Sequence, residues 1–270
     1  MRALMKVGFS LLVLAFLLIG LSYSMLRAQG ISNPSSGVGR AVQSETRAIN
    51  GDVRGIDLSG PIDLTLRQGA VPSLVVRGEQ RLLGNIDTTR GSDGTLHIGT
   101  TGMLLHHRQP LQVTLVLPSI EDISVRGNGD STVNGFSGDR IEVNLDGSGN
   151  VKFNGRFKDV KAEIHGSGEL EMNGGASDKV EVALVGSGRM TVVGSTRVFK
   201  AEQTGSGDVI ARHLSADEVN LQMMGSGDAV VTALKSVEVT LRGSGDAVVY
   251  GGPTQRNVSR NGSGEVAFKP

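Results

Sequence analysis

Cysteine and tryptophan are absent from this chain of 270 residues, and aromatic residues make up only 3% of it. The lack of cysteine excludes disulfides, Cys-ligated zinc and iron–sulfur sites, thiol catalysis and a lipidated cysteine anchor. Because large aromatic side chains are so scarce, Val, Leu, Ile, Ala and Met have to fill the core. Such a core suits a thin, layered structure better than a globular enzyme.

Neither sign of charge is in excess, since the chain has 27 basic and 27 acidic residues. A formal net charge of zero gives no global electrostatic basis for binding nucleic acid, so no such partner is predicted. Glycine, by contrast, is abundant: its 39 residues are roughly twice the average share.

The N-terminus has the features of an export signal. Arg2 and Lys6 precede a run from Val7 to Leu21 that is apolar apart from Ser10. Residues 1–28 are therefore predicted to be a hydrophobic leader helix, either a cleaved signal peptide or an uncleaved membrane anchor. Residues 29–45, rich in Gly, Ser and polar residues, are predicted to be a flexible spacer. Both alternatives place the body of the protein outside the cytoplasm, in the cell envelope, in the periplasm or secreted. The membrane is then a partner only through an uncleaved leader.

A Gly-x-Gly unit recurs eight times between Gly127 and Gly264, and seven of the eight units read Gly-Ser-Gly. The steps between units are 20, 19, 20, 19, 20, 18 and 19 residues. A nearly constant period of this length is typical of a stacked repeat architecture. The units begin at Gly127, Gly147, Gly166, Gly186, Gly205, Gly225, Gly243 and Gly262.

Apolar and polar residues alternate on both sides of each unit, as in Ile141, Val143 and Leu145 before Gly147. Alternation with a period of two predicts strands with one buried face. Each repeat is thus expected to be a strand, a Gly-Ser-Gly turn, a second strand and a short loop, the loops marked by Asn-Gly or a lone Gly. An antiparallel meander would also keep the alternation, but a constant interval favours a β-helix of about 19–20 residues per coil, whose coils need neighbours of the same shape.

Residues 46–120 are also β in character but less regular. We expect this segment to begin the stack and cap its first coil, so that 46–270 form a single domain with the regular repeats in 121–270. The strands expected in the capping part are Ile62–Leu66, Ser73–Gly78, Leu96–Gly99 and Gln112–Pro118.

The segment IDLSGPIDLTLRQG at 56–69, the segment LPSIEDISVRGNGD at 117–130 and the serial V-x-V-x-L-x-G-S-G-D-V units together resemble the head GIN domain family of auto-transporter adhesins. The resemblance covers residues 46–268. It implies an all-β, right-handed β-helix on an envelope or secreted protein. No catalytic residue is established for the family, so none can be carried over to this chain.

The residue after each corner is usually acidic or amidic: Asp130, Asn150, Glu169, Asp208, Asp228, Asp246 and Glu265, with Arg189 as the exception. Stacked at coil spacing, Asp208, Asp228 and Asp246 would form a carboxylate ladder, which could bind a hard cation. The calcium-binding β-roll repeat, however, is a nonapeptide with paired glycines, and neither feature is present. The favoured interpretation is that these residues tolerate the corner geometry and bond to local backbone N–H groups.

No catalytic, cofactor-binding or metal-binding residue is predicted, and no cofactor. The carboxylates follow the repeat, whereas a glycosidase needs two of them in different environments. His106 and His107 are expected to be solvated, and His165 and His213 occur once each among the repeats. The prediction is a non-catalytic envelope or secreted solenoid with an adhesive, surface-recognition or structural role. Its partner would be an envelope polysaccharide, another surface protein or a second copy. A carbohydrate-active enzyme or polysaccharide-binding module is the alternative.

Overall fold

The computed structural model describes residues 41–49, 52–101 and 110–270. Val42–Pro270 form one compact unit. The predicted leader and most of the predicted spacer lie outside the described residues, as do His106 and His107. Within the described ranges no helix is long and apolar enough to cross a membrane. The elements are β1 (Val42–Arg47), β2 (Gly55–Ser59), β3 (Ile62–Gln68), β4 (Ser73–Glu79), α2 (Gln80–Leu83), β5 (Ile86–Arg90), β6 (Thr95–Thr100), β7 (Leu111–Leu117), β8 (Asp122–Gly127), β9 (Asp130–Gly147), β10 (Asn150–Gly166), β11 (Glu169–Gly186), β12 (Arg189–Gly205), β13 (Asp208–Gly225), β14 (Ala229–Gly243), β15 (Ala247–Tyr250), β16 (Gln255–Gly262) and β17 (Val266–Phe268).

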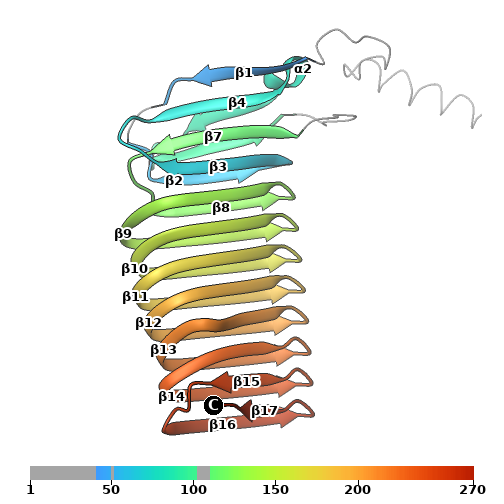
Figure 1. Ribbon diagram of the computed structural model, residues 1–270. Helices are drawn as coiled ribbons and strands as arrows, with labels where there is room; N and C mark the ends of the chain where they lie inside the picture. Colours follow the sequence, from blue (N-terminus) through green and yellow to red (C-terminus); the bar gives the residue numbers. More distant parts are fainter. Residues whose placement is uncertain (1–40, 50–51, 102–109) are drawn as a thin grey trace, which may run out of the picture. The chain divides into compact units, whose positions relative to one another are not determined.

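The repeat region is a right-handed β-solenoid, in which the strands of neighbouring coils pair in parallel (Figure 1). The first glycines of successive corners are register partners: Gly147 pairs with Gly166, and Gly166 pairs with Gly186. The predicted β-helix is therefore confirmed, and the meander is excluded.

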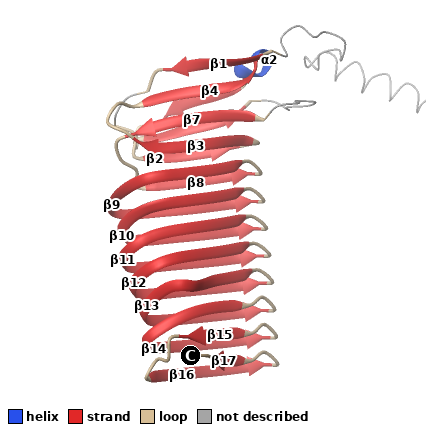
Figure 2. Ribbon diagram, viewed as in Figure 1, coloured by secondary structure: helices blue, strands red, loops and turns tan. Residues whose placement is uncertain are grey.

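Each of β9 to β13 runs from one Gly-Ser-Gly corner to the next and so forms a complete coil, folded into two layers (Figure 2). The short loops predicted halfway round are mostly absent. Strand β10 continues through Asn154-Gly155, with only a shift of register against β9. The backbone can stay paired around this bend because the neighbouring coil bends at the same place. A true loop occurs after β15, at Gly251.

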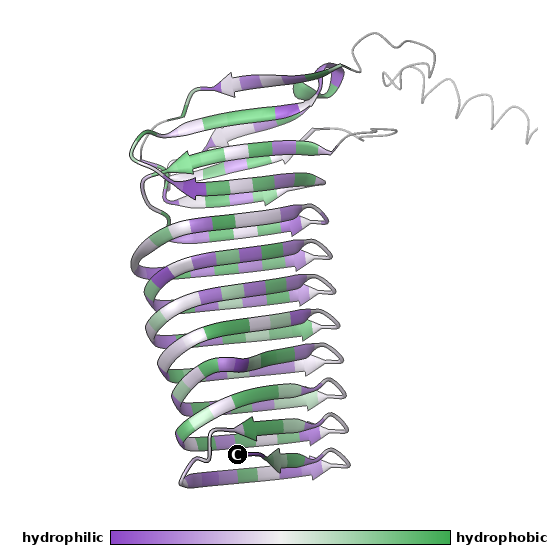
Figure 3. Cartoon of the chain, in the orientation of Figure 1, coloured by the Kyte–Doolittle hydropathy of each residue, from purple (hydrophilic) through white to green (hydrophobic). Residues whose placement is uncertain are grey.

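The core lies between the two layers and consists of aliphatic columns. Leu145, Ile164 and Leu184 stack on one another in register, and all three are fully buried. Apolar and polar residues alternate along the strands, as the hydropathy colouring shows (Figure 3).

The order of the first coils departs from the chain order. Strands β2 and β3 form the first coil in sequence, but β6 and β7 pair with one side of it and β8 and β9 with the other. The second coil in sequence thus lies outside the first. The four strands predicted in this part are confirmed, as β3, β4, β6 and β7.

Antiparallel strands close this end of the stack. Strand β4 pairs with β7, β1 pairs with β4, and β5 pairs with β6. The strand β1 begins at Val42, so four residues of the segment predicted as spacer are paired with β4 instead. This pairing explains how 46–120 can both begin the stack and cap it.

The corner glycines are required by contact between coils. The first glycine of each unit has a positive φ, as at Gly205 (121°), which favours glycine on its own. The second, such as Gly207, needs no unusual φ, but a Cβ there would overlap the carbonyl oxygen of Gly188 in the preceding coil. Neighbouring corner backbones are therefore too close for any side chain.

We predict that Gly207→Val, in the middle of the stack, lowers the free energy of unfolding by roughly 2–4 kcal/mol through overpacking. Gly264→Val meets the carbonyl of Gly245 in the same way. It should nevertheless cost distinctly less, because the last coil can fray. The control Gly84→Ala, where a Cβ meets nothing within 4 Å, should change stability by less than about 0.5 kcal/mol. Urea unfolding of the three variants measures this, and equal small effects at both corners would contradict it.

Candidate binding surface

The two layers of the solenoid present two outer faces. We call the outward side chains of the half-coils that lead into a Gly-Ser-Gly corner face A, and those of the half-coils that follow it face B. Because parallel pairing is in register, outward residues of successive coils line up in columns on each face. Any site on these faces is therefore built from ladders of equivalent residues.

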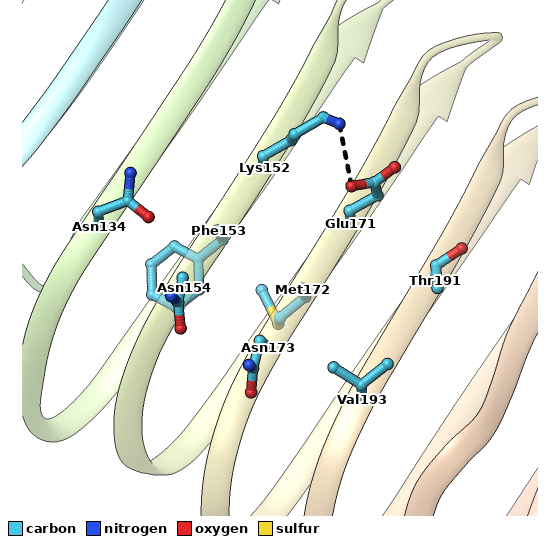
Figure 4. A pocket seen from close by; sticks show the side chains of 9 residues that line it. All are labelled: Asn134, Lys152, Phe153, Asn154, Glu171, Met172, Asn173, Thr191 and Val193. Atoms are coloured by element: carbon cyan, nitrogen blue, oxygen red, sulfur yellow. Dashed lines mark ion pairs between the residues drawn. The ribbon is translucent and has the colours of Figure 1, made fainter.

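Face B carries a hollow of about 290 Å³ across β9 to β12 (Figure 4). Its polar lining comes from one ladder of asparagines, Asn134, Asn154 and Asn173, and from Lys152 and Glu171. The Lys152 Nζ lies 3.2 Å from a Glu171 carboxylate oxygen, and both side chains are about half exposed. Buried Phe153 and Met172 and the outward Thr191 and Val193 complete the lining.

The asparagines differ in whether their side-chain amides form hydrogen bonds within the protein. The side-chain oxygen of Asn173 accepts a hydrogen bond from the backbone N–H of Gly175, at 3.2 Å, and so stabilises the bend. The side chains of Asn134 and Asn154 make no hydrogen bond to the described residues, and both are exposed. An amide offers two donors and an acceptor. These two residues are therefore free to bind a polar ligand.

A second hollow, of about 340 Å³, adjoins the first and shares Lys152 and Glu171 with it. It extends the polar surface to Asp130, Asn150 and Glu169 beside the corners. Asn150 donates a hydrogen bond to Asp130 at 2.8 Å, which orders this edge. The two hollows together form one polar trough, which crosses several coils along the stack.

The same face becomes apolar beyond the trough. The column that holds Lys152 and Glu171 continues in register through Ile210, Val230 and Val248, each half-buried. Beside it the guanidinium of Arg212 lies 4.5 Å from the centre of the Tyr250 ring. Face B thus changes from hydrogen-bonding to apolar along its length.

Face A carries a ladder of alternating charge. Lys161 lies 2.9 Å from Glu142 of the preceding coil and 2.8 Å from Glu163 of its own, and Lys200 lies 3.5 Å from Glu181. The hydrogen bonds that Lys161 donates to Glu163 and Glu142 raise the pKa of Lys161, and the bond to Glu142 lowers the pKa of the Glu142 carboxyl. The charged groups of this ladder therefore satisfy one another.

The carboxylates after the corners have a structural role. The Asp228 carboxylate accepts a hydrogen bond from the backbone N–H of Asp246 at 2.8 Å, and Asp246 does the same for Glu265 at 2.8 Å. Asp208 accepts from Asp228 at 3.2 Å. Asp208, Asp228 and Asp246 thus accept from backbone N–H groups as predicted, but the prediction that the partners are local is wrong, because each N–H belongs to the following coil. Among the residues that the structure describes, no group of three or more potential ligands could hold a metal ion.

The backbone itself accepts these hydrogen bonds in earlier coils. There the second corner glycine is the acceptor, as in the 3.0 Å bond from the Arg189 N–H to the Gly168 carbonyl. The change occurs at Gly207, whose carbonyl no longer receives the next coil's N–H. The amide of the buried Gln203 donates to this carbonyl instead. The buried glutamine is explained by this change of acceptor.

The predicted single histidines stay outside the trough. The Nδ1 of His165 lies 3.5 Å from an Asp146 carboxylate oxygen on face A, and both side chains are about half exposed. His213 is exposed in the part of β13 where the register against β14 shifts. The trough is not evident from the sequence, because Asn-Gly pairs there indicate only loops. Their recurrence at one repeat position, with Lys152 and Glu171 two residues before Asn154 and Asn173, was the available signal.

The family model described as "Putative auto-transporter adhesin, head GIN domain" matches residues 52–178 and 161–253. This chain belongs to that family. The resemblance inferred from the corner units and from 56–69 is thereby confirmed. No curated protein matches the chain by sequence.

Solved structures share the fold. A putative adhesin from Parabacteroides distasonis is 22% identical with a TM-score of 0.79, and the match covers 86% of this chain and 98% of that one. A putative lipid binding protein from the same species is 22% identical with a TM-score of 0.77, covering 85% and 97%. A putative adhesin from Parabacteroides merdae is 22% identical with a TM-score of 0.73, covering 87% and 98%. At this identity the likeness shows the solenoid fold and nothing further.

We predict that Asp228→Ala lowers the free energy of unfolding by about 0.5–1.5 kcal/mol, because the Asp246 N–H loses its acceptor. Glu169→Ala is the matched control at the same repeat position. There the next coil's N–H bonds to the Gly168 carbonyl, so no side-chain acceptor is lost. Asp228→Asn, which keeps an acceptor oxygen, should lie close to wild type. Thermal and urea unfolding at neutral pH compare the variants, and a loss at Glu169 as large as that at Asp228 would contradict the assignment.

Proposed function

We propose that this chain is a non-catalytic recognition protein of the cell envelope, whose face B binds an extended polysaccharide. The observation that carries the proposal is the polar trough with the free amides of Asn134 and Asn154 beside the Lys152–Glu171 pair. The adhesin description of the family is consistent with a recognition role.

The chemistry of the trough suits a polymer of hydroxyl groups. Amide side chains both donate and accept hydrogen bonds, and a lysine and a glutamate add a charged donor and a charged acceptor. Neutral sugars and sugars bearing a carboxylate or an amine could both be accommodated. Because the ladder repeats at the spacing of parallel strands, about 4.8 Å, it presents similar groups to successive units of a polymer.

The apolar end of face B complements the trough. Ile210, Val230 and Val248 offer a flat surface to the C–H faces of sugar rings, and Tyr250 adds the aromatic contact that the rest of the face lacks. Both surfaces are shallow, so each contact is weak. Binding would gain strength from the number of coils that one polymer chain spans.

The arrangement of carboxyl groups supports a role without catalysis. A glycosidase uses one carboxyl of raised pKa close to a second carboxylate. Burial, and then the charge of Glu142, raise the pKa of Asp122. Asp122 pairs in register with Glu142 in the column of face A, whereas the trough lies on face B. The carboxyl whose pKa is raised, that of Asp122, and the proposed ligand surface are thus on different faces.

The envelope location rests on the sequence of the leader, in which two basic residues precede the apolar run from Val7 to Leu21. A surface that binds polysaccharide is of use only where such polymers are exposed. Export and the chemistry of face B therefore support the same role.

Native affinity electrophoresis in gels that contain soluble polysaccharides, neutral and acidic, tests the proposal. The wild-type protein should be retarded by at least one of them, and Asn134→Ala/Asn154→Ala should weaken the apparent affinity about tenfold, roughly 1.4 kcal/mol. Gln222→Ala, which removes an exposed amide from face A, is the matched control and should bind like wild type.

Equal retardation of the double variant and wild type, with unchanged melting temperatures, would contradict the assignment of the trough. Retardation by none of the polysaccharides would contradict the proposed ligand class. Release of reducing sugar by the wild-type protein would contradict the non-catalytic role.

A further inference from the structure

The C-terminal coil exposes an unpaired sheet edge. Strand β16 pairs with β14 on one side, and β17 pairs with β15. No other strand among the described residues pairs with the outer edge of either (Figure 1). An open edge of parallel strands is a template for another strand and hence a risk of end-to-end association.

Two inward positions of this coil carry charged residues where the neighbouring coil has apolar ones. In register, Val237 of β14 pairs with Arg256 and Leu241 pairs with Arg260. Strands β9 to β14 each have an apolar residue at the first of these positions, whereas β16 has arginine at both and keeps only Val258 between them. The last layer of the core is therefore partly charged.

Both arginines use their charged ends on the coil itself. The Nε of Arg256 donates to the Pro253 carbonyl at 3.0 Å, and its guanidinium lies 4.4 Å from the centre of the Phe268 ring. An Nη of Arg260 donates to the Gly264 carbonyl at 3.2 Å. These contacts hold the two guanidinium groups over the end of the stack.

At the Gly264 carbonyl, Arg260 takes the place of a backbone N–H donor. In earlier coils the second corner glycine accepts a hydrogen bond from the backbone N–H of the following coil, as Gly149 does from Glu169 at 3.1 Å. At Gly264 an arginine supplies the donor in its place. Inside the stack, Gln203 makes the same contact with Gly207, so the position is suited to a long hydrogen-bonding side chain.

We propose that Arg256 and Arg260 form a polar cap, which prevents the C-terminal coil from stacking on a second copy of this chain. A second copy would have to bury two guanidinium groups against its own strands, which is costly without paired charges. Inward-pointing charge is one of the ways in which edge strands avoid edge-to-edge pairing.

The test restores an apolar layer at this end. In Arg256→Val/Arg260→Leu the two positions carry the residues that β14 has in register, so the coil gains a normal core surface. Sedimentation velocity and light scattering at increasing protein concentration should show a monomer for wild type and dimers or longer assemblies for the variant. Adding Val258→Lys to this variant returns an inward charge and should restore the monomer.

Arg197→Val/Arg242→Leu is the matched control, because it removes two exposed arginines from interior coils. Circular dichroism and thermal melts of all variants establish that they are folded. A folded double variant that stays monomeric would overturn the proposal. So would association that Val258→Lys does not reverse, association of the control pair, or a wild-type protein that already associates.

Discussion

The structure depends on the close approach of backbone to backbone at the Gly-Ser-Gly corners. At Gly205 and Gly207 the preceding coil lies directly against the α-carbon, and the carbonyl oxygens of Gly186 and Gly188 occupy the space of a side chain. The same approach lets the Ser206 N–H bond to the Gly186 carbonyl at 2.9 Å. One contact thus both requires glycine and satisfies the backbone at the turn.

The remaining features follow from this spacing. Once the corners are in register, every residue lies beside its equivalent in the next coil, so the aliphatic residues form columns inside and the polar residues form ladders outside. The core is mainly aliphatic, and four phenylalanines of the repeat region, Phe136, Phe153, Phe157 and Phe199, are buried in it. The surface ladders serve different ends: ion pairs on face A, hydrogen bonds between coils at Asp228 and Asp246, and the trough on face B.

Much of the fold could be predicted because each repeat has the same local structure and pairs with its neighbours in the same way. The period located the corners, and the alternation located the strands and most of the core. The order of the first coils could not be predicted, because β7 and β9 are both compatible in pattern with β3 and only their pairing decides which side each takes. The trough was missed for a similar reason, since Asn134 and Asn154 are ordinary loop residues in sequence and become a ladder only when stacked. The acceptor after a corner could not be predicted from the corner motif, because Gly-Ser-Gly precedes both Glu169, where the Gly168 carbonyl accepts, and Asp228, where the carboxylate accepts.

Native-state hydrogen exchange at the corners tests the central claim most directly. The amides of Ser206 and Ser226 donate to the carbonyls of Gly186 and Gly205 at 2.9 Å. If these contacts hold the stack together, both amides should exchange as slowly as those of the buried strand residues Leu184 and Leu221, through global unfolding alone. Exchange of the two serine amides at rates near those of an unstructured peptide, while the strand amides stay protected, would show that the corners are loose surface loops and would contradict the account.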